Sequence, residues 1–300
     1  MKICVIGLGR MGHAVAFRLI SGGHEVWGFD TDSNNLKLAS GIGVKVVFAV
    51  QELAQHASIF WLMIPAGDAV DSVINQLINV LKPGDILVDG GNSHFHDSVR
   101  RYKMLKEKQI NFVDCGTSGG VQGKELGFSL MIGCDKNVFD KLEPIFKVLA
   151  TSGGYAYMGP AGAGHYVKMV HNGIEYALLQ SYAEGFHLLK EGEYKDLDLA
   201  KVCDVWNHGS IIRSWILDLS HNVFIKDQNF SDISGQIGEN KTGRWTIDEA
   251  KNKYVPVDLI ERALEIRALS RKTGGNYATK IVALLRNQFG GHPFKKNGEE

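Results

Sequence analysis

Short apolar runs and amphipathic stretches alternate along the first half of the chain. The apolar runs have the length of buried strands, and the stretches between them repeat apolar residues with the period of a helix. Strands that alternate with helices predict a parallel sheet with right-handed crossovers. We therefore expect an α/β Rossmann-like parallel-sheet domain, with strands at 2–6, 25–29, 58–65, 85–89, 111–115 and 130–133. The expected helices run from after Gly12 to about residue 21 and over 68–81, 96–108 and 137–149.

The pattern changes between residues 151 and 164. Beyond this stretch the β-branched runs stop, and longer helical patterns occupy residues 164–191, 198–220, 256–271 and 276–289. An all-α C-terminal domain is expected, and the two domains are predicted to span residues 1–160 and 161–300. The short polar tail, residues 295–300, is expected to be disordered.

The first strand runs directly into a glycine-rich loop that is followed by a helix. A GxGxxG pattern alone is weak, because glycines also serve ordinary tight turns. The strand before it and the helix after it are the context that dinucleotide binding requires, since the pyrophosphate then sits on the helix N-terminus. We expect the cofactor to be bound by Gly7, Leu8, Gly9, Arg10, Met11, Gly12 and Asp30, and by Met63, Ile64, Pro65 and Asn92 at the ends of later strands.

Asp30 ends the second strand and bears on the choice of cofactor. A carboxylate there accepts hydrogen bonds from the ribose 2′-hydroxyl of NAD but repels the 2′-phosphate of NADP. Asp32 adds a second acid and residues 30–33 contain no arginine, although Lys37 is a nearby cation that weakens the inference. NAD is therefore expected, with NADP the less favoured cofactor.

A polar stripe marks the first long helix of the second half. Lys168, His171, Asn172 and Glu175 stand at i, i+3, i+4 and i+7, which places them on one helical face. The helix is expected to lie largely inside, where a polar face is costly unless its groups are paired or used. From this segment alone, a functional site and a solvent-exposed helix face remain open alternatives. The apolar flanks are Val167, Met169, Val170, Ile174, Ala177, Leu178 and Leu179.

Two more glycine-rich loops, 90–93 and 116–120, follow predicted strands. The carboxyl ends of parallel strands meet at one edge of the sheet, where ligands bind in such folds. Glycines alone would indicate only tight turns. Asn92 and Ser118 add hydrogen-bonding side chains, which suit a polyhydroxy or carboxylate substrate.

Composition argues against several other classes. The 33 basic and 33 acidic residues balance to a net charge of zero, so no basic excess indicates nucleic acid. The four cysteines form no CxxC pair and the eleven histidines show no ligand spacing, which predicts reduced, buried thiols and no metal. No apolar run is long enough for a membrane span and no signal peptide is recognised, so we expect a cytoplasmic protein without membrane partners.

Taken together, these motifs resemble the decarboxylating 6-phosphogluconate dehydrogenases of the β-hydroxyacid dehydrogenase superfamily. The KMVHNGIEY stretch is the most specific, because other β-hydroxyacid dehydrogenases share only its Lys and the Asn four residues later. At 300 residues the chain is similar to a short form of the family. The matching segments are GLGRMG at 7–12, DGGNS at 89–93, GTSGG at 116–120, KMVHNGIEY at 168–176, TGRWT at 242–246 and RNQFGGH at 286–292.

The resemblance implies oxidative decarboxylation of 6-phosphogluconate to ribulose 5-phosphate and CO₂ with reduction of NAD, a pentose phosphate reaction. Lys168 would be the general base and acid, with a pKa lowered to about 7–8 by burial and cationic neighbours. Glu175 would protonate the enediol, and Asn172 is the third catalytic candidate. No metal is implied, because the 3-keto group of the intermediate withdraws the electrons.

The resemblance also implies the substrate-binding residues. In the family, the counterparts of Arg286 and His292 come from a neighbouring subunit, so a homodimer or homotetramer with a composite active site is implied. The helical domain would then serve both substrate binding and oligomerisation. Without the resemblance, Arg267 and Arg286 would be interpreted as a solvated helix face. The implied residues are Asn92, Ser118, Gly119, Gly120, His171, Asn172, Tyr176, Lys241, Arg267, Arg286 and His292.

One position departs from the family pattern. The family has a substrate-binding lysine two residues before the threonine of the TGRWT-type motif, and here that position is Asn240. Lys241 stands one residue later, so either it reaches the phosphate from a shifted register or that contact is altered.

Two other functions fit parts of the pattern. A β-hydroxyacid dehydrogenase acting on a small non-phosphorylated acid would keep Lys168 and Asn172 but would not need Glu175 or the two arginines. A non-catalytic dinucleotide-binding protein, such as a redox sensor, would need neither Lys168 nor Glu175. The joint presence of these residues favours the decarboxylating dehydrogenase.

Overall fold

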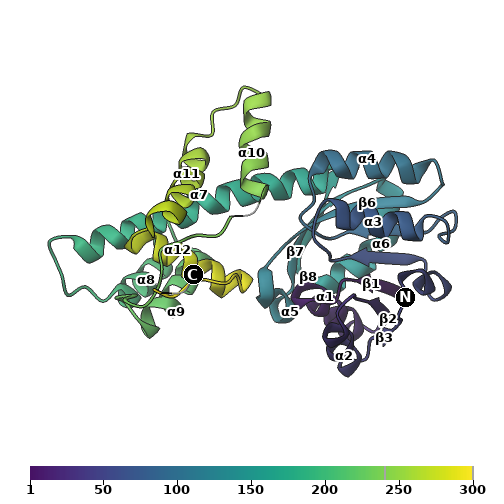
Figure 1. The fold of residues 1–300 in the computed structure, drawn as a ribbon, viewed down its shortest axis with the longest axis horizontal. Helices are drawn as coiled ribbons and strands as arrows, with labels where there is room; N and C mark the ends of the chain where they lie inside the picture. The colour runs from purple at the N-terminus through teal and green to yellow at the C-terminus, as the bar shows by residue number, and fades with distance from the viewer. Residues whose placement is uncertain (240, 299–300) are drawn as a thin grey trace. The chain divides into compact units, whose positions relative to one another are not determined.

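The computed structural model describes residues 1–239 and 241–298. The chain divides into two compact units, Met1–Met169 and Val170–Glu300. Helix α7 (Ala163–Glu191) begins in the first unit and continues into the second (Figure 1). The predicted division at residue 160 falls between strand β8 and this helix, and it stays a prediction.

An eight-stranded sheet forms the first unit, in the order β3-β2-β1-β4-β5-β6-β7-β8. The Rossmann-like α/β fold is confirmed, and the sheet is mostly parallel. The neighbouring strands are parallel except for β6 and β7, which are antiparallel. The strands are β1 (Lys2–Ile6), β2 (Glu25–Phe29), β3 (Lys45–Val46), β4 (Ile59–Leu62), β5 (Ile86–Asp89), β6 (Asn111–Ser118), β7 (Phe128–Gly133) and β8 (Ala150–Gly159).

The pair β6 and β7 departs from the predicted parallel arrangement, and the connection explains why. Only residues 119–127 join β6 to β7, including the short helices η2 (Gly120–Gln122) and α5 (Gly123–Leu126). A parallel return needs a crossover of a dozen or more residues, so this link turns the chain back antiparallel. Strand β8 was not expected, because its sequence contains three glycines and no long apolar run.

Helices cover both faces of this sheet and enclose two apolar cores. Alternate residues of each strand point to opposite faces, so Ile3 and Val5 join one core while Cys4 and Ile6 join the other. The first core is covered by α1 (Arg10–Ser21), α2 (Ser33–Gly41) and α6 (Lys136–Leu149), and the second by η1 (Val50–Gln55), α3 (Asp68–Leu77) and α4 (Phe95–Lys106).

The second unit is helical over its described residues, as predicted. The single helix expected at 198–220 is wrong, because Gly209 takes a φ of +95° and Ser214 caps a new helix by accepting a hydrogen bond from Leu217 N. Helix α10 was missed because its sequence is strongly polar. The helices after α7 are α8 (Leu199–Asn207), α9 (Trp215–Lys226), α10 (Lys241–Asn252), α11 (Asp258–Thr273) and α12 (Tyr277–Gly290).

The predicted disorder of the tail is wrong for its described residues. Ser234 N donates to Lys295 O at 2.9 Å, and Asn297 N donates to Asp232 O at 2.9 Å. These backbone bonds pair residues 295–297 with the segment before α10. Among the described residues, no helix has the length and apolar character needed to cross a bilayer.

Candidate active site

The glycine-rich loop packs directly against the end of β4. Gly7 has a φ of +86°, and a Cβ there would lie 2.6 Å from the carbonyl oxygen of Met63 and from the side chain of Ile64. A Cβ on Gly12 would lie 1.8 Å from Gly7 O. These two positions therefore require glycine, and the packing joins two of the predicted cofactor segments.

The N-terminus of α1 offers space and backbone donors for a pyrophosphate. Gly9 is its N-cap, and no side-chain hydrogen bond of the described residues caps the helix there. No heavy atom of the described residues lies within 4 Å of where a Cβ on Gly9 would stand. A helix N-terminus with no side-chain cap in the described part of the chain and with open space at Gly9 fits a bound phosphate group, so the loop suits a dinucleotide.

Asp30 links the end of β2 to this loop. Its Oδ2 accepts a hydrogen bond from Leu8 N at 2.6 Å, and its Oδ1 accepts one from Asp32 N at 2.8 Å. The carboxylate thus fixes the glycine loop. Sequence reasoning did not predict this contact, and the contact of Asp30 with a ribose stays a prediction.

A buried ionic network supports the loop that carries Asn92. Asp89 accepts hydrogen bonds from Ser93 Oγ at 2.7 Å and from Arg101 Nη1 at 3.2 Å. Arg101 is fully buried and also donates through Nε to Asp71 at 2.8 Å. Asn92 itself is exposed on this supported loop.

Lys168 lies on the second turn of α7 and is 6% exposed. A Cβ on Gly116 of β6 would stand 2.4 Å from the Cβ of Lys168, so the lysine stem crosses the strand where the strand has no side chain. Ser118 ends the same strand, and Gly119 and Gly120 follow with φ of +122° and +55°. The first unit thus holds Lys168 against the strand that leads to the predicted substrate loop.

The polar stripe continues along α7 into the second unit. His171 Nδ1 lies 3.2 Å from Asn172 Oδ1 and 3.9 Å from Glu175 Oε2, and Asn172 is buried. The expectation that the helix lies largely inside is wrong on its other side, where Val167, Ile174 and Leu178 are 37%, 51% and 45% exposed. The polar groups are therefore covered better than part of the apolar flank.

Tyr176 joins α7 to α10 and α11 within the second unit. Its hydroxyl lies 3.2 Å from Thr242 Oγ1, and a Cβ on Gly243 would stand 2.4 Å from its ring. The Arg267 guanidinium stacks on the same ring at 3.6 Å from the centroid. The KMVHNGIEY and TGRWT motifs thus pack together, and Arg267 lies above their contact.

Arg267 and Arg286 are buried cations rather than a solvated face. Arg267 is 1% exposed, and its Nη1 and Nη2 have no hydrogen-bond partner among the described residues. Burial, and to a smaller extent the charge of Arg286, lowers the pKa of Arg267 to about 10. Burial also lowers the pKa of Arg286, which is 6% exposed. Two buried guanidinium groups on one site favour a bound anion.

The remaining predicted residues lie at the borders of the helices. Lys241 is exposed at the start of α10, and Asn240 lies outside the described residues. His292 follows α12, where its ring contacts Phe289 edge to face and its carbonyl accepts a hydrogen bond from Asn287 Nδ2 at 3.0 Å.

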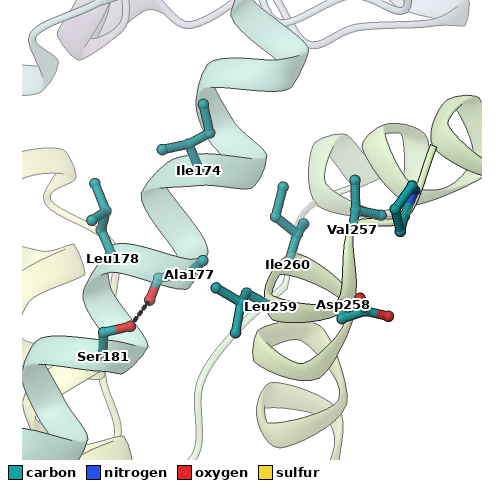
Figure 2. A pocket seen from close by; sticks show the side chains of 9 residues that line it. Ile174, Ala177, Leu178, Ser181, Val257, Asp258, Leu259 and Ile260 are labelled. Carbon is teal, nitrogen blue, oxygen red and sulfur yellow. Dashed lines mark hydrogen bonds between the residues drawn. The ribbon is translucent and has the colours of Figure 1, made fainter.

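A separate pocket of about 470 Å³ opens on the exposed side of α7. Figure 2 shows Ile174 and Leu178 of α7 on one side and Val257, Leu259 and Ile260 on the other. Asp258 is its only charged lining residue among those described, so this apolar hollow does not have the chemistry of the reaction centre. No group of three or more metal-ligating side chains occurs in the described part of the chain.

Sequence reasoning missed Asp114, which accepts a hydrogen bond from His165 N in the first turn of α7, and it missed His165 itself. Asp114 follows an apolar run as Asp30 and Asp89 do, and this recurrence was the available signal. The contact of Thr242 with the Tyr176 hydroxyl was also missed, although Thr242 begins the TGRWT segment at 242–246.

The fold and the glycine loop define a dinucleotide-binding protein with a helical second unit, and comparison with known proteins agrees. A model of the NAD binding domain of 6-phosphogluconate dehydrogenase matches residues 2–159. A model of the 6-phosphogluconate dehydrogenase C-terminal domain matches residues 164–288. The chain belongs to the 6-phosphogluconate dehydrogenase family.

Individual relatives give the same family. The NAD(+)-dependent, decarboxylating 6-phosphogluconate dehydrogenase of Haloferax volcanii is 44% identical over 297 residues, which cover 97% of this chain and 98% of that protein. The Plasmodium falciparum 6-phosphogluconate dehydrogenase, solved with NADP+ and with 6-phosphogluconate, has a TM-score of 0.82 at 32% identity. That match covers 91% of this chain but 62% of the longer Plasmodium chain.

A more distant structure shares the fold alone. The Mycobacterium tuberculosis 3-hydroxyisobutyrate dehydrogenase has a TM-score of 0.76 at 21% identity, covering 95% of this chain and 99% of that chain.

Proposed function

We propose that the protein oxidises and decarboxylates 6-phosphogluconate to ribulose 5-phosphate and CO₂. NAD held at the glycine loop 7–12 would supply the acceptor for the hydride that leaves C3 of the substrate. Lys168 accepts the proton of the C3 hydroxyl and returns it to the carbonyl oxygen as CO₂ leaves. Glu175 then protonates C1 of the enediol, and Asn172 holds the substrate beside Lys168.

The observation that carries this proposal is the buried arginine pair. Nη1 and Nη2 of Arg267 have no hydrogen-bond partner in the described part of the chain, and they lie beside the ring of Tyr176. The charges of Arg286 and Glu175 act on this guanidinium. A phosphate monoester offers the negative charge and the several acceptor oxygens that such a pair needs. A small non-phosphorylated hydroxy acid would bring no phosphate oxygens to these guanidinium groups.

The other substrate contacts rest on family membership. We assign Asn92, Ser118, Gly119 and Gly120 to the carboxylate and hydroxyls, His171 to a further sugar contact, and Lys241 and His292 to the phosphate end. Lys241 is exposed at the start of its helix, which leaves its side chain accessible to a ligand.

NAD is the proposed cofactor in preference to NADP. The support is the paired acids at the end of β2, where Asp30 binds Leu8 N and Asp32 accepts a hydrogen bond from Asn34 N. A 2′-phosphate placed there would meet two carboxylates.

We further propose a homodimer or homotetramer in the cytoplasm, with a helical substrate-binding and oligomerisation domain at 161–300. In a composite site Arg286 and His292 would come from a neighbouring subunit. Against this stands the charge of Arg286 acting on Arg267 within one chain. Mixed assembly of Lys168→Ala and Arg286→Ala subunits distinguishes a composite site from a site within one chain. Activity returns only if one subunit completes the site of the other.

Initial rates with 6-phosphogluconate and NAD, then NADP, test the reaction directly. Reduced cofactor and CO₂ should form in equal amounts, with the higher kcat/KM for NAD. Reduced cofactor without CO₂ would instead identify a simple β-hydroxyacid dehydrogenase and remove the role given to Glu175.

Lys168→Ala tests the assignment of the base. Turnover should fall by about 10³-fold or more while NAD binding is kept, since a positioned general base contributes about 10²–10⁴-fold. Activity within tenfold of wild type would refute the assignment.

A further inference from the structure

Strand β6 presents three residues of interest on one face. Asp114, Gly116 and Ser118 stand at alternate positions, and successive side chains of a strand point to opposite faces. Asp114 contacts the start of α7, Gly116 lies under Lys168, and Ser118 leads to the predicted substrate loop. One face of β6 therefore contacts both the start of α7 and the stem of Lys168.

Asp114 caps α7 from a distant part of the chain. Its Oδ1 accepts a hydrogen bond from Gly162 N at 2.6 Å, and its Oδ2 accepts one from His165 N at 2.8 Å. Gly162 precedes the helix, and His165 is the third residue of α7. A helix usually takes its capping oxygen from its own sequence, but Gly162 has no side chain, so the carboxylate comes from 48 residues earlier.

Three glycines let the helix lie directly on the strands. A Cβ on Gly164 would stand 2.3 Å from Met131 O, and a Cβ on Gly133 would stand 2.7 Å from Asp114 Oδ1 and from Gly164 N. On Gly116 it would meet the Cβ of Lys168 at 2.4 Å. With so little space between helix and sheet, a shift of the helix start moves Lys168.

His165 makes a second attachment one turn before Lys168. It is 1% exposed, and its Nδ1 lies 2.7 Å from Ser98 Oγ of helix α4. The backbone of His165 is thus held by β6 and its ring by α4. Both attachments act on the turn that precedes the predicted base.

Burying the carboxyl group of Asp114 costs free energy, because the group loses its hydration. Asp114 is fully buried, and burial raises the pKa of its carboxyl, although His165 and the two amide hydrogen bonds act in the opposite direction. A buried acid is tolerated when its oxygens are well bonded. Here both oxygens are bonded to the start of one helix.

We propose that Asp114 is a positioning residue for Lys168, which fixes the first turn of α7 on β6 and so sets where the lysine amine meets the substrate. The proposal rests on the proposed function, because it assumes that Lys168 is the base. Asp114 itself touches no reacting atom.

Asp114→Asn is the first test, because the amide keeps one acceptor but turns an NH₂ toward a backbone N–H. With 6-phosphogluconate and NAD, kcat should fall by about 100-fold, the cost of moving a catalytic group by roughly 1 Å. The Kd for NAD should stay within about twofold. The deuterium isotope effect on kcat/KM with C3-deuterated substrate should rise, because a misplaced base makes chemistry slower.

Asp85→Asn is the matched control. Asp85 is also buried, accepts a hydrogen bond from Lys82 N at 2.8 Å and lies at the opposite end of β5 from the substrate loops. The Asp85→Asn substitution should lower the melting temperature of the protein, while kcat and the isotope effect stay near their wild-type values.

Gly116→Ala provides a second variant if Asp114→Asn folds poorly. It displaces the Lys168 stem without changing any charge, so it should show the same loss of kcat and the same rise in isotope effect. Hydrogen exchange gives a readout that does not depend on activity, because Asp114→Asn should deprotect the amides around Gly162 and His165 and Asp85→Asn should not.

The outcomes separate the two proposals. Activity that falls only in proportion to folded protein, with an unchanged isotope effect, would overturn the positioning role. Unchanged exchange around residues 162–165 in Asp114→Asn would overturn the anchor itself. A wild-type protein that does not turn over 6-phosphogluconate would overturn the proposed function, while the exchange experiment would still decide the anchor.

Discussion

Two fully buried arginines, one in each unit, have opposite surroundings. Arg101 is 0% exposed and donates to Asp71, Asp89, Ser93 and the carbonyl of Gly67. Arg267 is 1% exposed, but its terminal nitrogens have no hydrogen-bond partner among the described residues. Burial costs a guanidinium its hydration in both places, and only at Arg101 do protein groups replace it.

The difference separates a structural arginine from one suited to a ligand. Arg101 completes a network that holds the start of α3 and the loop of Asn92, so its partners are already present. Arg267 has the aromatic face of Tyr176 beneath it, and no described residue accepts a hydrogen bond from its terminal nitrogens. The phosphate of a phosphorylated substrate would accept charged hydrogen bonds from Arg267, as the carboxylates of Asp71 and Asp89 do from Arg101.

The largest effect is expected on the stability of Arg101→Met. Removing one partner of a buried ion pair leaves Asp89 buried and uncompensated, which costs about 3–5 kcal/mol. Chemical denaturation should show this loss as a lower midpoint. Arg100→Met is the control, because Arg100 also bonds Asp71 at 2.7 Å but is half-exposed, and such pairs contribute at most about 1 kcal/mol. Equal losses in both variants would contradict the structural role of Arg101.

Arg267→Met should show the opposite pattern. The free energy of unfolding should change by less than about 1 kcal/mol, because no hydrogen bond of the terminal nitrogens is lost. The kcat/KM for 6-phosphogluconate should fall by at least about 100-fold, since each hydrogen bond to a charged group contributes about 1.5–3 kcal/mol. Arg262→Met, on the exposed side of the same helix, should leave both quantities unchanged. A destabilised but active Arg267→Met would remove the distinction between the two arginines.

Ligand-induced stabilisation sharpens the comparison in the wild-type protein. At 100 times its Kd, 6-phosphogluconate should stabilise the fold by about 2.7 kcal/mol, measured as a rise in melting temperature. Gluconate at the same concentration lacks the phosphate and should have a much smaller effect. The shift should disappear in Arg267→Met. Equal shifts with gluconate and 6-phosphogluconate would exclude the arginine pair as the phosphate site.

The smallest effect concerns the cofactor. Asp30→Asn keeps an acceptor for Leu8 N but removes the charge, so the preference for NAD over NADP should fall by about tenfold, or roughly 1.4 kcal/mol. Asp30→Ala also loses the loop contact and should weaken both cofactors. Initial rates with each cofactor measure the ratio, and an unchanged ratio in Asp30→Asn would show that selectivity has another origin.

Local sequence patterns were enough to predict much of the molecule. The glycine loop and the polar stripe of α7 depend on residues a few positions apart, so spacing alone predicts the elements that carry them. The cysteines were predicted to be reduced and buried, and all four are free and buried. The antiparallel β7 was not predicted, because strand direction depends on the length of the link before it.

Contacts between distant residues escaped the sequence analysis. Arg267 meets Tyr176 across 91 positions, and Asp114 reaches His165 across 51. Nothing in the local pattern distinguishes Arg101, with its full set of partners, from Arg267. Exposure of Ile174 and Leu178 was equally unpredictable, because an apolar stripe does not specify what covers it. Catalytic roles assigned by resemblance therefore stay predictions until the variants are measured.

The burial of the cysteines has a practical consequence for handling the protein. Burial raises the pKa of Cys4, Cys134 and Cys203 to about 12, and that of Cys115 further still. Alkylating reagents and peroxides attack the thiolate, which these groups do not form near neutral pH. The folded enzyme should keep its activity through iodoacetamide treatment and storage without reducing agent. Thiol labelling then becomes a sensitive report of unfolding.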